Sequence, residues 1–208
     1  MAIRSLDELN NISTPPEEYF GDMDLSEQQK KDRIKYTYEA YDAILFAMAL
    51  IDTYRDYGKV DYDYVKRQLE DRIAAIIAGF TVLDDYLLQY SSDFAQNFVD
   101  STEKHIGEEW YISEDRSLFD AENSANDTQN YIDYINALKN GMTHKEWRTE
   151  RDNKVRGTHR MVDRKVLPIT EYFVVGEALM RFPKDEELAF DYPKELINCR
   201  CTMKYIKK

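Results

Sequence analysis

Apolar residues recur at helical spacing through the first two thirds of the chain. Between Val65 and Tyr90 they follow one another at steps of three and four, which predicts one long amphipathic helix. An earlier run with the same spacing predicts a helix that begins at Ser26, where Gln29 completes a capping box, and ends at Gly58. We expect these two helices to pack against each other.

Two further helices are predicted, one from about Ser92 to Gly107 and one from about Asp127 to Asn140. Residues 108–123 show no clear pattern. No proline lies between Glu17 and Leu167, which permits long helices because proline breaks a helix interior. The pattern of residues 26–141 therefore predicts a helical bundle.

The pattern changes at Thr143. Thr143 and Glu146 have capping-box spacing, which predicts a short helix over 144–152. Beyond it, alternating apolar and polar residues predict a hairpin over 158–167 and strands at 172–175 and 196–203. Residues 142–208 thus predict a small α+β unit with a short antiparallel sheet.

The first 25 residues contain Pro15-Pro16 and no regular periodicity, so we interpret 1–25 as an extended arm that a partner would order. The predicted fold class is α+β, mostly α: an N-terminal long-helix bundle followed by a small C-terminal α+β unit.

Composition and charge support this division. Hydrophobic residues make up 43% of the chain, enough for a sizeable core. Residues 1–141 contain 13 Lys and Arg against 29 Asp and Glu, a net charge of −16, and residues 142–208 contain 15 against 11, a net of +4, which together give the overall −12. This change of sign marks the predicted domain boundary at 141/142. We expect a soluble protein without a secretion signal or a membrane span, made in a reducing cytoplasm.

The two cysteines, Cys199 and Cys201, are one residue apart. On a strand, residues i and i+2 project from one face, so both sulfurs could reach one metal ion. His159 is the expected third ligand and Asp163 the fourth, and zinc is the metal that suits thiolate and imidazole. Two alternatives stay open: buried structural thiols, which are common for free cysteines, and a redox pair.

Several residues in order carry a family resemblance. They are Trp147, Thr149, Asp152, Val155, Arg156, His159 and the closing Asn198, Cys199, Arg200 and Cys201. In this pattern, residues 140–206 resemble the phage Mu protein F-like family of minor head (head morphogenesis) proteins of tailed bacteriophages and prophages. The family's turn after the histidine usually reads Asp-Gly. Here it reads Asp163-Arg164, and a turn with positive φ at both positions would disfavour an arginine.

The resemblance implies a structural component of the virion, made in the bacterial host cytoplasm and placed in the phage head, at the portal vertex or the capsid interior. Its implied partners are portal and capsid proteins, with no small-molecule substrate and no membrane. A basic run of Arg148, Arg151, Lys154, Arg160 and Arg164 is a candidate contact to such a partner or to packaged double-stranded DNA. Internal pairing with acidic neighbours is the alternative.

The sequence contains no glycine-rich phosphate loop and no metalloprotease or nucleophile-elbow motif, so we expect no enzyme. The alternative is a small metal-independent, ribonuclease-like or other toxin-like enzyme. It would use His159 as acid and base beside Thr158, with Arg156 or Arg160 holding a phosphate.

Overall fold

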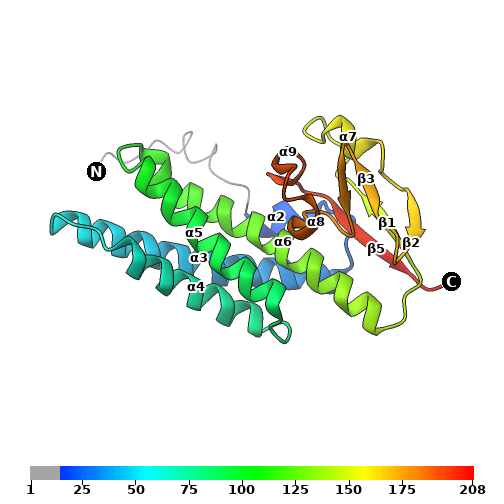
Figure 1. Cartoon of the computed structure of the whole chain (residues 1–208), viewed down its shortest axis with the longest axis horizontal. Helices are drawn as coiled ribbons and strands as arrows, with labels where there is room; N and C mark the ends of the chain where they lie inside the picture. Colours follow the sequence, from blue (N-terminus) through cyan, green and yellow to red (C-terminus); the bar gives the residue numbers. More distant parts are fainter. Residues whose placement is uncertain (1–14) are drawn as a thin grey trace. The chain divides into compact units, whose positions relative to one another are not determined.

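The computed structural model describes residues 15–208 and is α+β, mostly α, as predicted. Its elements in chain order are α2 (Pro16–Gly21), α3 (Glu27–Asp56), α4 (Tyr62–Ala78), α5 (Asp85–Lys104), η1 (Glu109–Ile112), α6 (Glu114–Lys139), β1 (His144–Arg148), α7 (Gly157–Arg160), β2 (Val166–Pro168), β3 (Phe173–Val175), β4 (Ala178–Met180), α8 (Glu186–Ala189), α9 (Pro193–Leu196) and β5 (Thr202–Ile206) (Figure 1).

The chain forms two compact units. The first comprises the described residues up to Tyr19 and Ile34–Ser124, and the second comprises Phe20–Arg33 and Ala125–Lys208. The sequence placed the boundary at 141/142 instead. Charge changes sign there, but packing changes earlier, because α6 contributes its second half to the second unit.

Helices build the first unit. The buried residues of α4 are Val65, Leu69, Ile73 and Ile77, which recur at steps of four as an apolar helical face requires. Polar atoms also join the helices: the Tyr36 hydroxyl of α3 and the Tyr90 hydroxyl of α5 both lie within 3.0 Å of Ser124 Oγ of α6. The predicted bundle is thus present in this unit.

The prediction of one continuous helix from Val65 to Tyr90 was wrong. Helix α4 ends at Ala78 and α5 begins at Asp85, not near Ser92. Gly79 occupies the C-cap of α4, and the carboxylate of Asp84 accepts the Leu87 amide at 3.0 Å as the N-cap of α5. Helices α4 and α5 pack against each other, and each buries an apolar face whose residues recur at steps of three and four. The spacing therefore continues through both helices and gave no sign of the break.

Helix α6 begins earlier than predicted, at Glu114 instead of about Asp127. The hydroxyl of Ser113 accepts the Arg116 amide at 3.2 Å, which satisfies a free amide at the helix start. The capping box predicted for α3 is confirmed in both directions: the Ser26 amide donates to Gln29 Oε1 at 3.1 Å and the Gln29 amide to Ser26 Oγ at 3.3 Å.

An antiparallel sheet in the order β2-β1-β5 organises the second unit. The predicted helix over 144–152 was wrong, since His144–Arg148 is the central strand, β1. Thr143 does not cap a helix; its amide donates to the Ile206 carbonyl at 3.0 Å and continues the pairing with β5. Tertiary pairing thus overrides the capping-box spacing.

The predicted hairpin over 158–167 was also wrong. Residues 157–160 form the short helix α7, and only Val166–Pro168 is a strand, β2. Arg164 does adopt a positive φ of 62°, despite its side chain. Its amide donates to the Trp147 carbonyl at 2.8 Å and its guanidinium lies 2.8 Å from Asp24, so outside contacts hold the conformation.

The strand predicted at 172–175 is present as β3, which pairs with β4 in a hairpin that turns at Gly176 (φ 63°). The last strand lies later than predicted, because β5 begins at Thr202 and not at Leu196.

Of the predicted arm, residues 1–14 lie outside the described residues. The remainder is not an extended arm, because Pro16–Gly21 is a helix and Phe20 and Met23 are buried. Within residues 15–208, no helix combines the length and apolar character needed to span a membrane.

Candidate metal centre

Three side chains meet inside the second unit: His159, Cys199 and Cys201. Their ligand atoms lie within 4.8 Å of one another, and His159 Nδ1 is 3.3 Å from Cys201 Sγ and 3.5 Å from Cys199 Sγ. Each side chain is at most 3% exposed. The structure thus unites the three residues predicted to bind metal, and this group could hold a metal ion.

Two short segments supply the three side chains. Helix α7 carries His159, which is buried. The cysteines lie on irregular chain between α9 and β5, not on a strand as predicted. Asn198 precedes them with a φ of 53°, a left-handed conformation that asparagine tolerates. This turn, and not a strand face, directs both sulfurs toward the imidazole.

Amide side chains of α6 hold the cysteine backbone in place. Asn126 Nδ2 donates to the carbonyls of Cys199 and Cys201, at 3.1 and 3.3 Å. Asn130 Nδ2 donates to the Cys201 carbonyl at 3.1 Å, and its Oδ1 accepts from Arg33. Because the chain between α9 and β5 has no ladder partner, these bonds satisfy carbonyls that would otherwise be buried alone.

Glu195 holds the other side of the imidazole. Its Oε2 lies 3.2 Å from His159 Nε2 and accepts the Thr158 hydroxyl at 2.7 Å. Glu195 is only 3% exposed. A Cβ at Gly176 would come within 2.6 Å of Glu195 Oε1, so only glycine leaves room for the carboxylate there.

The indole of Trp147 closes a further side of the group. Its ring lies edge-on to the His159 ring, with centroids 5.9 Å apart, and to the Phe173 ring at 5.2 Å. Trp147 is fully buried. Aromatic walls keep water away, which strengthens every electrostatic interaction inside.

The three groups shift one another's proton affinities. The hydrogen bond between the two cysteines lowers the pKa of Cys199 far below its usual value and raises that of Cys201. Burial acts to lower the pKa of His159, but its hydrogen bond to Cys199 and the negative charge there raise it overall. Negative charge is therefore favoured on Cys199 over Cys201.

Asp163, predicted as the fourth ligand, does not belong to this group. Its Oδ1 accepts the Thr149 amide at 3.0 Å and its Oδ2 lies 2.7 Å from Arg151 Nε. Among the described residues, the metal-ligand group therefore comprises three side chains.

Asp152 organises the loop that leads to α7. Its Oδ1 accepts the amides of Lys154 and Val155, and its Oδ2 pairs with Arg200 Nη2 at 2.6 Å. Burial acts to raise the pKa of Asp152, but the bonds to Arg200 and to these amides lower it overall. Arg156 bonds the Ile197 carbonyl and ties the same loop to the segment before the cysteines.

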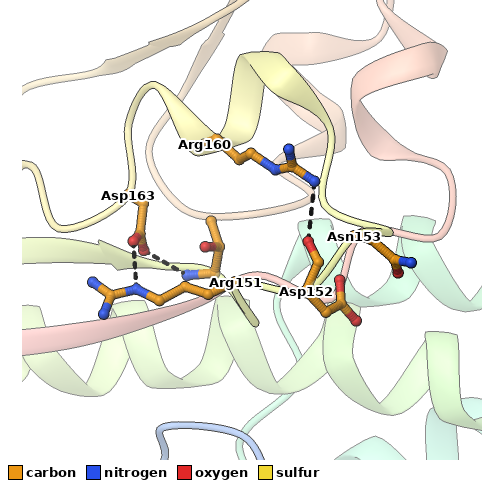
Figure 2. Close-up of a pocket in the computed structure, with 6 residues that line it drawn as sticks. Arg151, Asp152, Asn153, Arg160 and Asp163 are labelled. Atoms are coloured by element: carbon orange, nitrogen blue, oxygen red, sulfur yellow. Dashed lines mark hydrogen bonds and ion pairs between the residues drawn. The ribbon is translucent and has the colours of Figure 1, made fainter.

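The basic run is mostly paired inside the unit. Arg148 pairs with Asp24 and Glu146, and Arg164 with the same two carboxylates. Figure 2 shows the open pocket where Arg151 meets Asp163 and where Arg160 Nη2 donates to the Asp152 carbonyl at 3.1 Å. The side chain of Lys154 is exposed.

Sequence reasoning missed Glu195, Asn126 and Asn130 as parts of the site. One signal was available for the asparagines: they lie four residues apart in a helix, at positions where a buried face would normally be apolar. Glu195 gave no such signal, because only the fold shows that α9 lies beside α7.

Comparison of the chain with known proteins gave no matching family model, no similar curated protein and no similar solved structure. The interpretation of the site therefore depends on its geometry and on the sequence resemblance.

Proposed function

We propose that the chain is a minor head protein of a tailed bacteriophage, a structural part of the phage head that acts in head assembly at the portal vertex or the capsid interior. One observation carries the proposal. The residues behind the resemblance are spread from Trp147 to Cys201. Four of them, Trp147, His159, Cys199 and Cys201, meet in one buried group, while Asp152 pairs with Arg200 and Arg156 bonds the Ile197 carbonyl nearby in the chain. Scattered letters that matched a family pattern by chance would not be expected to converge in this way.

The second unit also carries a surface suited to protein contact. In the β3–β4 hairpin, Phe173 and Met180 are buried on one face. On the other face Val174 and Leu179 stand directly opposite each other in the register and are 56% and 48% exposed. An apolar cross-strand pair on a solvent face favours contact with another protein. We assign this face to a portal or capsid partner.

DNA contact has less support than protein contact. Four of the five basic residues in the candidate run bond to carboxylates or to a carbonyl of the same unit. A guanidinium that already has a carboxylate partner has less to gain from a phosphate. The proposal therefore gives these arginines a structural role.

The enzyme alternative has no specific support. A general acid and base must reach its substrate, whereas His159 is 1% exposed and has a sulfur or a carboxylate facing each ring nitrogen. Arg156, the expected phosphate ligand, bonds the Ile197 carbonyl. The proposed role needs no turnover.

The test is co-purification with the portal protein encoded in the same genome. We expect the full chain to be retained by the tagged portal, and the double substitution Val174→Lys and Leu179→Glu to weaken that retention at least about tenfold, as loss of a central contact does. The matched control is Val82→Lys, because Val82 is 85% exposed but belongs to the first unit. Circular dichroism should show the same helix content in all three proteins.

Two results would contradict the proposal. The first is the absence of the chain from purified phage heads by mass spectrometry, together with no retention by the portal. The second is RNA cleavage by the purified chain that His159→Ala abolishes, which would favour the ribonuclease alternative.

A further inference from the structure

The spacing of the three ligand atoms in the second unit matches a specific coordination geometry. In a tetrahedral zinc site, with zinc about 2.3 Å from sulfur and about 2.0–2.1 Å from nitrogen, a nitrogen and a sulfur ligand stand about 3.5 Å apart. His159 Nδ1 lies 3.3 Å from Cys201 Sγ and 3.5 Å from Cys199 Sγ. The two nitrogen–sulfur separations are thus close to those that a zinc ion would require, and the two sulfurs lie within 4.8 Å of each other.

The imidazole also has a carboxylate near its other nitrogen, at ion-pair distance. A histidine that binds metal usually donates its second N–H to a carboxylate, which fixes the tautomer and the ring orientation. Glu195 Oε2 lies 3.2 Å from His159 Nε2, and the Thr158 hydroxyl fixes the same oxygen. An ion held between Nδ1 and the sulfurs requires the tautomer with its proton on Nε2, the nitrogen that faces Glu195.

We infer that His159 Nδ1, Cys199 Sγ and Cys201 Sγ bind one zinc ion, and that Glu195 and Thr158 position the imidazole from its far side. Glu195 itself is not a ligand, because its carboxylate lies on the Nε2 side of the ring and the sulfurs lie on the Nδ1 side. Three protein ligands leave one tetrahedral position open.

Charge and ligand type favour zinc. Two thiolates neutralise a divalent cation, so the buried group of ion and ligands carries no net charge. Sulfur and imidazole suit zinc, whereas calcium and magnesium require oxygen ligands. The buried Glu195 beside the imidazole is more than two structural thiols would need.

The inference does not depend on the phage assignment, because it concerns metal in the purified chain. The full chain, freed of any polyhistidine tag and kept reduced, is loaded with zinc, desalted and analysed by elemental mass spectrometry. We expect about one zinc per chain. Cys201→Ser should reduce zinc to background. His144→Asn is the matched control, since the chain has three histidines and His144 lies outside the group; this variant should keep its zinc.

A measurement on the unaltered chain guards against variants that fail to fold. Cobalt(II) added to the metal-free chain should give the intense visible bands of a tetrahedral site and a thiolate-to-cobalt charge-transfer band, and zinc should remove both. A reduced wild-type chain that retains no zinc and gives no cobalt bands would overturn the inference, leaving buried thiols. A Cys199–Cys201 disulfide that forms in air and persists with zinc present would overturn it in favour of a redox pair.

The role of Glu195 has its own test. Glu195→Gln should lower zinc affinity about 10–100-fold in competition with a chromophoric chelator, while one zinc still binds at saturation. Glu177→Gln is the control, because that carboxylate is 76% exposed. Equal affinity for Glu195→Gln and wild type would show that the carboxylate does not position the ligand.

Discussion

Helix α4 in the first unit and the segment that carries the cysteines in the second unit represent two ways of holding a chain in place. Helix α4 buries Val65, Leu69, Ile73 and Ile77 along one face and needs few polar contacts beyond its caps. The cysteine segment has no regular hydrogen-bonding partner, and side chains of α6 bond its carbonyls. A core of apolar side chains tolerates many substitutions that keep its volume and pattern, whereas a buried polar network loses stability when any one of its hydrogen-bonding groups is removed.

The largest expected loss of stability comes from the apolar core of helix α4. Ile73→Ala removes a side chain with no exposed surface, so it should lower the free energy of unfolding by about 2–5 kcal/mol through lost burial and the cavity left behind. Urea denaturation followed by helical circular dichroism measures it. Val82→Ala, at a position 85% exposed, should change stability by less than about 0.5 kcal/mol. Equal effects of the two would contradict the assignment of the core.

The second prediction concerns the polar side. Asn126→Leu keeps the side-chain size but removes the donor to the Cys199 carbonyl and the Oδ1 acceptor of Arg33 Nε, while Asn130 still bonds the Cys201 carbonyl. We expect a loss of about 2–4 kcal/mol, since each buried polar group that loses a partner costs about 1–3 kcal/mol. Asn123→Leu is the matched control on the same helix, because Asn123 bonds only the carbonyl of Phe119 one turn earlier. Zinc retention should fall in the first variant only.

The same contrast explains what the sequence could predict. Local signals were sufficient where contacts are local: the Ser26–Gln29 capping box marks the start of α3, and apolar steps mark α4. They failed where distant segments decide. Thr143 and Glu146 have helix-start spacing, yet β1 forms there because β5, near the end of the chain, pairs with it. The break at Gly79 was hidden because the apolar period continues across it.

The residues of the candidate metal centre also differ in whether the sequence could predict them. His159, Cys199 and Cys201 could be predicted because thiols one residue apart carry a chemical meaning in any fold. Glu195 could not, because a carboxylate gains its role from the imidazole that the fold places beside it. Asp163, a candidate fourth ligand, is not at the group, because its oxygens bond Thr149 and Arg151.

The third prediction concerns a buried polar side chain in the first unit, which is built from helices. Glu122 is 4% exposed, its Oε1 has no hydrogen-bond partner among residues 15–208, and burial raises its pKa from 4.5 to about 8. The folded state therefore keeps a proton that the unfolded state loses, so the contribution of Glu122 to stability falls as pH rises from 4.5 through about 8. Glu122→Gln removes this loss and should be more stable by about 1–2 kcal/mol at the alkaline end.

Urea midpoints across this pH range measure the difference. The gap between Glu122→Gln and wild type should be small near pH 4.5 and should widen to its full value above about 8. Asp120→Asn is the control on the same helix, because Asp120 already pairs with Arg116 and its substitution should lower stability. A gap that is independent of pH would show that Glu122 does not retain its proton on folding.

The smallest effect tests whether helix ends differ between the units as their interiors do. Asp61 caps α4 by accepting the Tyr64 amide at 3.0 Å, whereas α7, α8 and α9 have no side-chain hydrogen bond at their N-caps. The long helix α4 thus has a capping bond at its start, and the short helices do not.

Asp61→Ala should cost about 1 kcal/mol of folding stability. Asp63→Ala, which loses only a favourable charge in the first turn, should cost a few tenths, about 0.3 kcal/mol. Thermal melts separate the two values, and if Asp63→Ala cost as much as Asp61→Ala, charge near the helix end and not the capping bond would stabilise α4.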